Sequence, residues 1–156
     1  MATEIMPAVV NCTLRNGLAI YQNADWILRI RINNSTDNPF DLTGYEGKCA
    51  IKEHTGDDIP IAMPSVNIID AKDGVFELYL PNEETAKFKC DGQSFREVNV
   101  YEYDVYFMKG DNSYRALMGR IEVSPTVFQD DDNWVFQILF LPICPTCNYL
   151  QVGHFF

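Results

Sequence analysis

The chain has 156 residues, 47% of them hydrophobic, and its 12 basic and 22 acidic side chains give a net charge of −10. This length favours one domain with a sizeable core, and the apolar content excludes intrinsic disorder. The negative charge argues against nucleic acid as a partner, because a nucleic-acid binder needs clustered Lys and Arg to replace phosphate counterions.

The cysteines and the apolar segments bear on the compartment of the protein. Five cysteines, an odd number without dense spacing, favour a reducing site of synthesis. The first residues carry Glu4 and Pro7 and lack the basic and apolar regions of a signal peptide. The most apolar segment, 134–143, is about half the length of a membrane-spanning helix. We therefore expect a protein made in the cytosol and not anchored in a membrane.

The first half of the chain predicts short strands separated by turns. Residues 1–16 lack clear periodicity and are interpreted as an N-terminal arm or irregular edge segment. A short strand is expected at 18–22, a stronger one at 25–33, and a turn at 34–39, where Asn, Ser, Thr, Asp and Pro are concentrated. The apolar face of the second strand is formed by Trp26, Leu28, Ile30 and Ile32.

Three further segments extend the strand pattern toward the middle of the chain. An apolar row comprises Leu42, Tyr45, Gly47, Cys49 and Ile51, with Cys49 packed as a small apolar residue. Segment 59–70 has two short apolar runs separated by Pro64, which suits an edge strand that breaks and changes sheet. A strand at 75–80 directs Phe76, Leu78 and Leu80 inward, and Asn82 is a plausible cap of a short helix.

The strongest hairpin signal lies at 98–123, where two alternating segments are joined by a turn at 109–112. Counted from Leu18, about seven short strands with almost no helix predict an all-β, immunoglobulin-like antiparallel β-sandwich, with a closed barrel as the alternative. The expected core face of the hairpin comprises Tyr101, Tyr103, Val105, Phe107, Leu117, Gly119, Ile121 and Val123.

The composition changes after Pro125. An acidic run at 130–132 precedes a long apolar stretch that begins at Trp134. We interpret 1–16 as an N-terminal arm, 17–127 as the sandwich, and 128–156 as an acidic linker with an apolar C-terminal arm. The arm either completes its own sandwich or lies on a neighbouring subunit, which is the interpretation that we favour. Its expected interface residues are Trp134, Phe136, Ile138, Phe140, Leu141, Phe155 and Phe156.

Metal binding has only partial signals. Cys144 and Cys147 have the spacing of half a zinc knuckle, with His154 as a conceivable third ligand, but a structural zinc site needs four ligands. A disulfide or plain thiols in a packed turn are the other interpretations. The acidic run at 130–132 offers oxygen donors for calcium without the alternating spacing of a known loop. We predict no metal and no cofactor.

Catalysis has little support in the sequence. The histidines are His54 and His154, and no nucleophile, metalloprotease or phosphate-loop motif is present. Glu77 and Asp104 could mimic a pair of glycosidase carboxylates, but they fall on expected solvent faces. We therefore expect no enzyme and no catalytic residues. Outward tyrosines at 79, 106 and 114 leave open a carbohydrate-binding role.

Four short motifs carry a resemblance to a known family. They are Ile20–Asp25, Asp41–Tyr45, Asp73–Leu78 followed by Pro81 and Thr85, and Tyr101–Val105 answered by Leu117–Val123. Their order resembles a domain of tailed-bacteriophage virion proteins, including the amino-terminal domain of upper baseplate proteins, over roughly residues 17 to 127. The family usually has Gly where Asn23 stands, and Asn is the best substitute at positive φ.

The resemblance implies an immunoglobulin-like building block of a virion, without enzymatic activity, assembled in the host cytoplasm. Its expected partners are other virion structural proteins, in a homo-oligomer or multi-copy symmetric assembly, with neither nucleic acid nor membrane. A tail, baseplate, neck or capsid-decorating position is compatible with it. The alternative function is a host-glycan-binding accessory domain on the virion surface.

Overall fold

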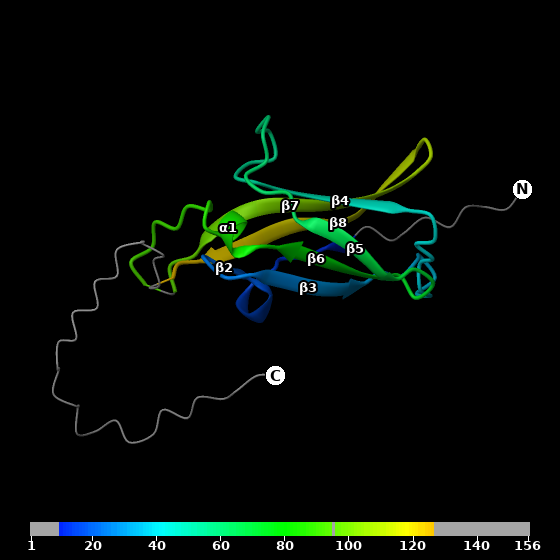
Figure 1. Cartoon of the computed structure of the whole chain (residues 1–156), viewed down its shortest axis with the longest axis horizontal. Helices are drawn as coiled ribbons and strands as arrows, with labels where there is room; N and C mark the ends of the chain where they lie inside the picture. Colours follow the sequence, from blue (N-terminus) through cyan, green and yellow to red (C-terminus); the bar gives the residue numbers. More distant parts are fainter. Residues whose placement is uncertain (1–9, 95, 127–156) are drawn as a thin grey trace, which may run out of the picture.

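The computed structural model describes residues 10–94 and 96–126, which form two packed β-sheets (Figure 1). The larger sheet has the order β1-β8-β7-β4, with β2 also paired to β8, and the smaller sheet has the order β3-β6-β5. The strands are β1 (Val10–Asn11), β2 (Ile20–Tyr21), β3 (Trp26–Arg31), β4 (Glu46–Lys52), β5 (Ser65–Asp70), β6 (Val75–Leu80), β7 (Asn99–Lys109) and β8 (Asn112–Ser124).

This arrangement is the predicted immunoglobulin-like β-sandwich rather than a closed barrel. The longer strands pair antiparallel, whereas the two-residue strands β1 and β2 pair parallel to β8. Two helical turns are present in the described residues, η1 (Asn16–Leu18) and α1 (Asn82–Thr85). In these residues no helix has the length and apolar character needed to cross a membrane.

The predicted hairpin is confirmed as β7 and β8, which pair along their whole length. Gly110 lies in the turn with a φ of +57°, a conformation that glycine adopts without steric cost. Tyr101, Tyr103, Val105 and Phe107 are buried on β7, as alternation predicts. The hairpin therefore supplies one wall of the core.

The smaller sheet supplies the opposite wall. Phe76 of β6 contacts Phe107 of β7 edge to face, with ring centroids 5.0 Å apart. Leu28 of β3 and Leu78 of β6 are buried beside them, which confirms the predicted inward faces of both strands. Apolar rows from both sheets thus form one continuous core.

The segment around Pro64 changes sheet as predicted. Ala62 forms a bridge with Ile51 of β4, and three residues later, at Ser65, the chain enters β5 in the other sheet. The backbone N–H of Ile51 donates to the Ala62 carbonyl at 2.9 Å. This segment closes the sandwich on the side where β4 and β5 approach each other.

The predicted capping role of Asn82 is wrong. Pro81 occupies the N-cap position of α1, and the Asn82 backbone N–H donates to Oδ1 of Asp25 at 2.8 Å. A carboxylate from the loop before β3 therefore satisfies a helix donor that a local cap would otherwise satisfy. The Thr85 hydroxyl adds a second tie by donating to the Ala24 carbonyl at 2.9 Å.

Candidate functional site

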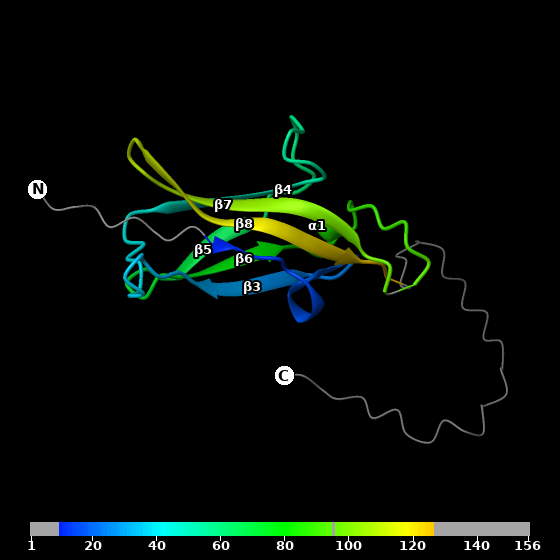
Figure 2. The ribbon, with the colours of Figure 1, turned by 180° about the vertical axis from the view of Figure 1, so that it is seen from behind.

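An apolar groove runs between the two sheets on the side opposite the Ala62 bridge. It has a volume of about 560 Å³ and lies between β3 of the smaller sheet and the β1 edge of the larger sheet. Figure 2 shows β1 and β3 one above the other on this side. Its apolar lining includes Cys12, Leu14, Leu18, Leu28 and Ile30, so the groove opens directly onto the hydrophobic core.

Residues before β2 build one bank of this groove. The Leu14 N–H donates to the Arg120 carbonyl at 2.7 Å, and the Glu122 N–H donates to the Leu14 carbonyl at 2.9 Å. Leu14 is buried and Leu18 is 44% exposed. A tie to β3 comes from the Trp26 indole, whose Nε1 donates to the Leu18 carbonyl at 3.1 Å.

The other bank is β3, which has a strand partner on one edge only among the described residues. The Ile32 N–H donates to the Gly74 carbonyl at 3.0 Å, which continues the register that pairs Ile30 with Phe76. Antiparallel strands bond through alternate residues. Ile27, Arg29 and Arg31 therefore direct their backbone N–H and C=O groups away from β6, toward the open edge.

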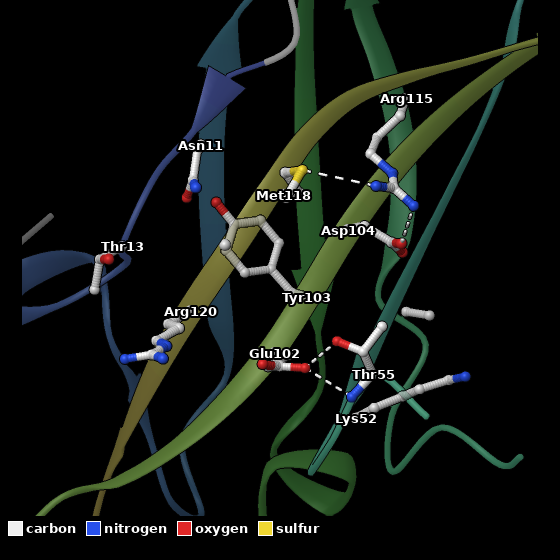
Figure 3. A pocket seen from close by; sticks show the side chains of 12 residues that line it. Asn11, Thr13, Lys52, Thr55, Glu102, Tyr103, Asp104, Arg115, Met118 and Arg120 are labelled. Atoms are coloured by element: carbon white, nitrogen blue, oxygen red, sulfur yellow. Dashed lines mark hydrogen bonds and ion pairs between the residues drawn. The ribbon is translucent and has the colours of Figure 1, made fainter. Parts of the chain in front are cut away.

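The outer face of the larger sheet carries a second, polar hollow of about 590 Å³ (Figure 3). Glu102 accepts hydrogen bonds from the Thr55 hydroxyl and from the Thr55 backbone N–H. These bonds, and the positive charge of Arg120, hold the pKa of Glu102 below its usual range. The carboxylate therefore serves to fix the loop after β4 on the sheet.

The two carboxylates considered as a glycosidase pair lie on different sheets. Glu77 of β6 accepts a hydrogen bond from Arg29 at 3.0 Å, and Asp104 of β7 lies 3.8 Å from Arg115. Each carboxylate thus has an arginine partner on its own sheet. Their placement on solvent faces agrees with the sequence prediction.

The tyrosines proposed as sugar platforms differ in exposure. Tyr114 is buried and only 8% exposed, so its predicted outward position is wrong. A register shift after Val105 places an extra residue in β8, and this bulge turns Tyr114 inward. Tyr106 is half-buried and lies under the guanidinium of Arg115, 5.2 Å from the ring centroid. The outer face of the larger sheet thus exposes less aromatic surface than strand alternation predicts.

The described cysteines are thiols in three settings. Cys12, Cys49 and Cys90 form no disulfides, and burial raises the pKa of Cys49 to about 12. Cys49 is therefore a packed neutral thiol, as predicted. Among residues 10–94 and 96–126, no cluster of three His, Cys, Asp or Glu side chains is arranged to hold a metal ion.

Several predicted sites lie outside the described residues. These are the acidic run at 130–132, the Cys144, Cys147 and His154 group, and all of the predicted interface residues of the C-terminal arm, which are Trp134, Phe136, Ile138, Phe140, Leu141, Phe155 and Phe156. The structure adds a surface that sequence reasoning missed, the groove beside β3. Its only sequence signal was the set of apolar residues within 12–18, in a segment without periodicity.

The strand order and the two buried faces define an all-β protein with an immunoglobulin-like sandwich. No protein-family model matches the sequence, and no curated protein matches it. Among solved structures the chain is similar to murine CRIg, at 15% identity and a TM-score of 0.29, over 78% of this chain and 96% of that chain. The fold class rests on the strand pairing, and this similarity adds no argument about binding.

Proposed function

We propose that this chain is a structural subunit of a tailed-bacteriophage particle that acts by protein–protein assembly. The proposal rests on the resemblance of four motifs in residues 17–127 to virion sandwich domains. Tail, baseplate, neck and capsid-decorating positions all suit such a subunit, which would be made in the host cytoplasm and present in several copies.

The observation that carries the proposal is the role of the motif residues in the fold. Asn23 has a φ of +63°, as expected where the family has glycine. Asp41 accepts a 2.8 Å hydrogen bond from the Thr43 N–H at the turn that leads into β4. At Gly74, with a φ of +65°, an added Cβ would lie 2.6 Å from two backbone carbonyl oxygens. Because these residues set the turns, their match supports a shared architecture.

The described side chains favour assembly over catalysis. The carboxylates Glu77 and Asp104 are paired with arginines, and His54 is exposed beside Asp57, with 3.8 Å between Nδ1 and Oδ2. General acid–base chemistry needs such groups to converge on one reacting position. The open groove beside β3 instead suits contact with another chain.

The C-terminal arm is the proposed interface. Burial of its large apolar side chains, at about 1.5 to 3 kcal/mol each, yields a gross gain on the order of 10 to 20 kcal/mol. Ordering a free arm costs roughly 1 to 2 kcal/mol per residue for the backbone. For the eight residues 134–141 alone this cost is about 8 to 16 kcal/mol, close to the gain, so a permanent assembly also needs the backbone hydrogen bonds that a preformed partner surface supplies.

Comparison of the full chain with a chain that ends at Gln129 tests this function. We expect the shortened chain to remain folded and monomeric by thermal melting and by light scattering after size exclusion, and the full chain to self-associate. A shortened chain that fails to fold would identify the arm as an intrinsic strand. The assembly proposal would then lose its principal interface.

A further inference from the structure

We propose that the open edge of β3 and the groove beside it receive residues 134–141 of a second copy of this chain as an added antiparallel strand. The inference rests on the proposed function, because it names the acceptor for the apolar arm. The same mode of recognition, in which a strand joins an open sheet edge, recurs among protein complexes.

The backbone of β3 is prepared for such pairing. Ile27, Arg29 and Arg31 direct their N–H and C=O groups away from β6, and no partner strand lies on that edge in the described part of the chain. The side chain of Ile27 is also 59% exposed. An incoming strand would therefore gain backbone bonds without displacing any that already exist.

The apolar side chains on one face of the arm match the apolar lining of the groove. Trp134, Phe136, Ile138 and Phe140 share one face of a strand, and Pro142 ends the segment that can donate to a ladder. The groove has a volume of about 560 Å³, and its apolar lining includes Leu14, Leu18, Leu28 and Ile30. Its size falls within the range of sites that bury large apolar groups. One face of the arm would complete the core where the sandwich is open.

The exposed guanidinium of Arg31 favours an antiparallel direction for the added strand. The charged lining of the groove consists of Arg29, which pairs with Glu77 at 3.0 Å, and of Arg31 and Asp37 toward the carboxyl end of β3. Arg31 is 4.0 Å from Asp73 and its side chain is 55% exposed. The acidic run at 130–132 immediately precedes the arm, so an antiparallel arm would bring these aspartates beside Arg31.

This direction favours a second copy over the same molecule. The β8 end adjoins β2, where the Gln22 N–H donates to the Ser124 carbonyl, and β3 begins at that same end of the sandwich (Figure 1). Segment 127–133 reaches at most about 25 Å. The length of β3 alone is about 20 Å. An arm from the same molecule would need nearly its whole reach to arrive at Arg31 and would then have to reverse.

Proline substitution at the edge is the first test, in the full chain. Ile27→Pro removes an N–H that faces the open edge and leaves the bonds to β6, whereas Ile27→Ala keeps that N–H and is the matched control. We expect Ile27→Pro to weaken self-association at least about tenfold and Ile27→Ala to have a much smaller effect. Association of Ile27→Pro equal to the wild type, with a retained melting transition, would overturn the inference.

A charge swap gives a second readout that does not depend on tolerance of proline. Arg31→Asp should weaken association, and Arg31→Asp combined with Asp131→Lys should restore it. The Arg31 side chain is 55% exposed and Asp131 is one of three successive aspartates, so we expect both variants to fold. Equal association of the wild type and the single variant would contradict the predicted direction of the strand.

Mixing two full-length variants separates a second copy from the same molecule. One carries Ile27→Pro with an intact arm, and the other carries Phe136→Asp and Ile138→Asp with an intact edge. Each alone should associate at least about tenfold more weakly than the wild type, and at a concentration where each alone is monomeric an equimolar mixture should form a one-to-one complex by light scattering. A monomeric mixture would refute exchange between copies.

The outcomes separate the inference from the proposed function. If the chain that ends at Gln129 loses association while Ile27→Pro keeps it, the arm is the interface and the β3 edge is not its acceptor. If the shortened chain associates as well as the full chain, the arm is not the interface and both proposals fail.

Discussion

Substitution of Gly119 by Ala probes how the residues before β2, which form one bank of the groove, are held against β8. Gly119 lies in β8 with a φ of +154°, and a Cβ at this position would be 2.1 Å from the carbonyl oxygen of Cys12. No real contact of that kind is this short, so the backbone at Cys12 must move. The change therefore displaces the first described segment from β8 and from the Tyr103 hydroxyl of β7.

The expected loss follows from the bonds at risk and the strain. Alanine at this φ adds about 1 to 3 kcal/mol of backbone strain. Four bonds at about 0.5 to 1.5 kcal/mol each add to it, although some can re-form after a small shift, so we expect about 3 to 5 kcal/mol in total. The bonds run from Cys12 N to Met118 O (2.9 Å), Leu14 N to Arg120 O (2.7 Å), Glu122 N to Leu14 O (2.9 Å) and Tyr103 Oη to Cys12 O (3.0 Å).

Urea unfolding, with hydrogen exchange of residues 12–14 as a local readout, measures this loss. Gly17→Ala is the matched control, because a Cβ there meets nothing within 4 Å. Gly110→Ala, at a φ of +57° in open space, should cost only the strain of positive φ, about 1 to 2 kcal/mol. If Gly119→Ala is as stable as Gly17→Ala, the contact between Cys12 and β8 is not as the structure has it.

Three further changes test the core and its ionisable groups. Phe76→Ala should cost about 3 to 5 kcal/mol in urea unfolding, because it removes the ring against Phe107; a loss below 1 kcal/mol would contradict that packing. Burial raises the pKa of Cys49 to about 12, so the neutral thiol contributes its full stabilisation of the fold below the unfolded pKa, and this contribution is lost as the pH rises toward 12. Cys49→Ala should therefore make the free energy of unfolding less dependent on pH between pH 9 and 12. Because the pKa of Glu102 is lowered in the folded protein, its carboxylate stabilises the fold at pH values above the unfolded pKa, and this stabilisation is lost as the pH falls through the folded pKa. Thr55→Val should raise the pKa of Glu102 in an NMR titration, and an unchanged pKa would show that the Thr55 hydroxyl does not lower it.

Strand alternation was sufficient to predict the central sheet. The hairpin at 98–123 combines period-two apolar faces with a glycine turn, and both signals depend on neighbours close in sequence. The same reason explains the correct inward faces of β3 and β6. The change of sheet near Pro64 was predictable because proline cannot continue a ladder in a central strand.

The remaining features depend on contacts that local patterns do not encode. Tyr114 is buried because β8 has one more residue than β7 between paired positions, and this single inserted residue reverses the side chains between the bulge and the hairpin turn. Asn82 is preceded by Pro81 at the N-cap, and its N–H pairs with Asp25, more than fifty residues earlier in the chain. Leu14 and Leu18 line the groove through pairing with β8 and through the Trp26 indole, neither of which leaves a periodic signal.

The two edges of the smaller sheet differ in a way that supports a specific use for one of them. On the β5 side, the segment through Ala62 bridges to β4 and brings the two sheets together. β3 has six residues, an apolar groove beside it and no such cover in the described chain. Soluble proteins blunt open edges with charge, and Arg29 and Arg31 provide that charge here. Arg29 is paired with Glu77, whereas Arg31 is 55% exposed and only 4.0 Å from Asp73. Because an exposed arginine repels basic strands and attracts the acidic run before the arm, Arg31 would both discourage indiscriminate pairing and select the proposed partner.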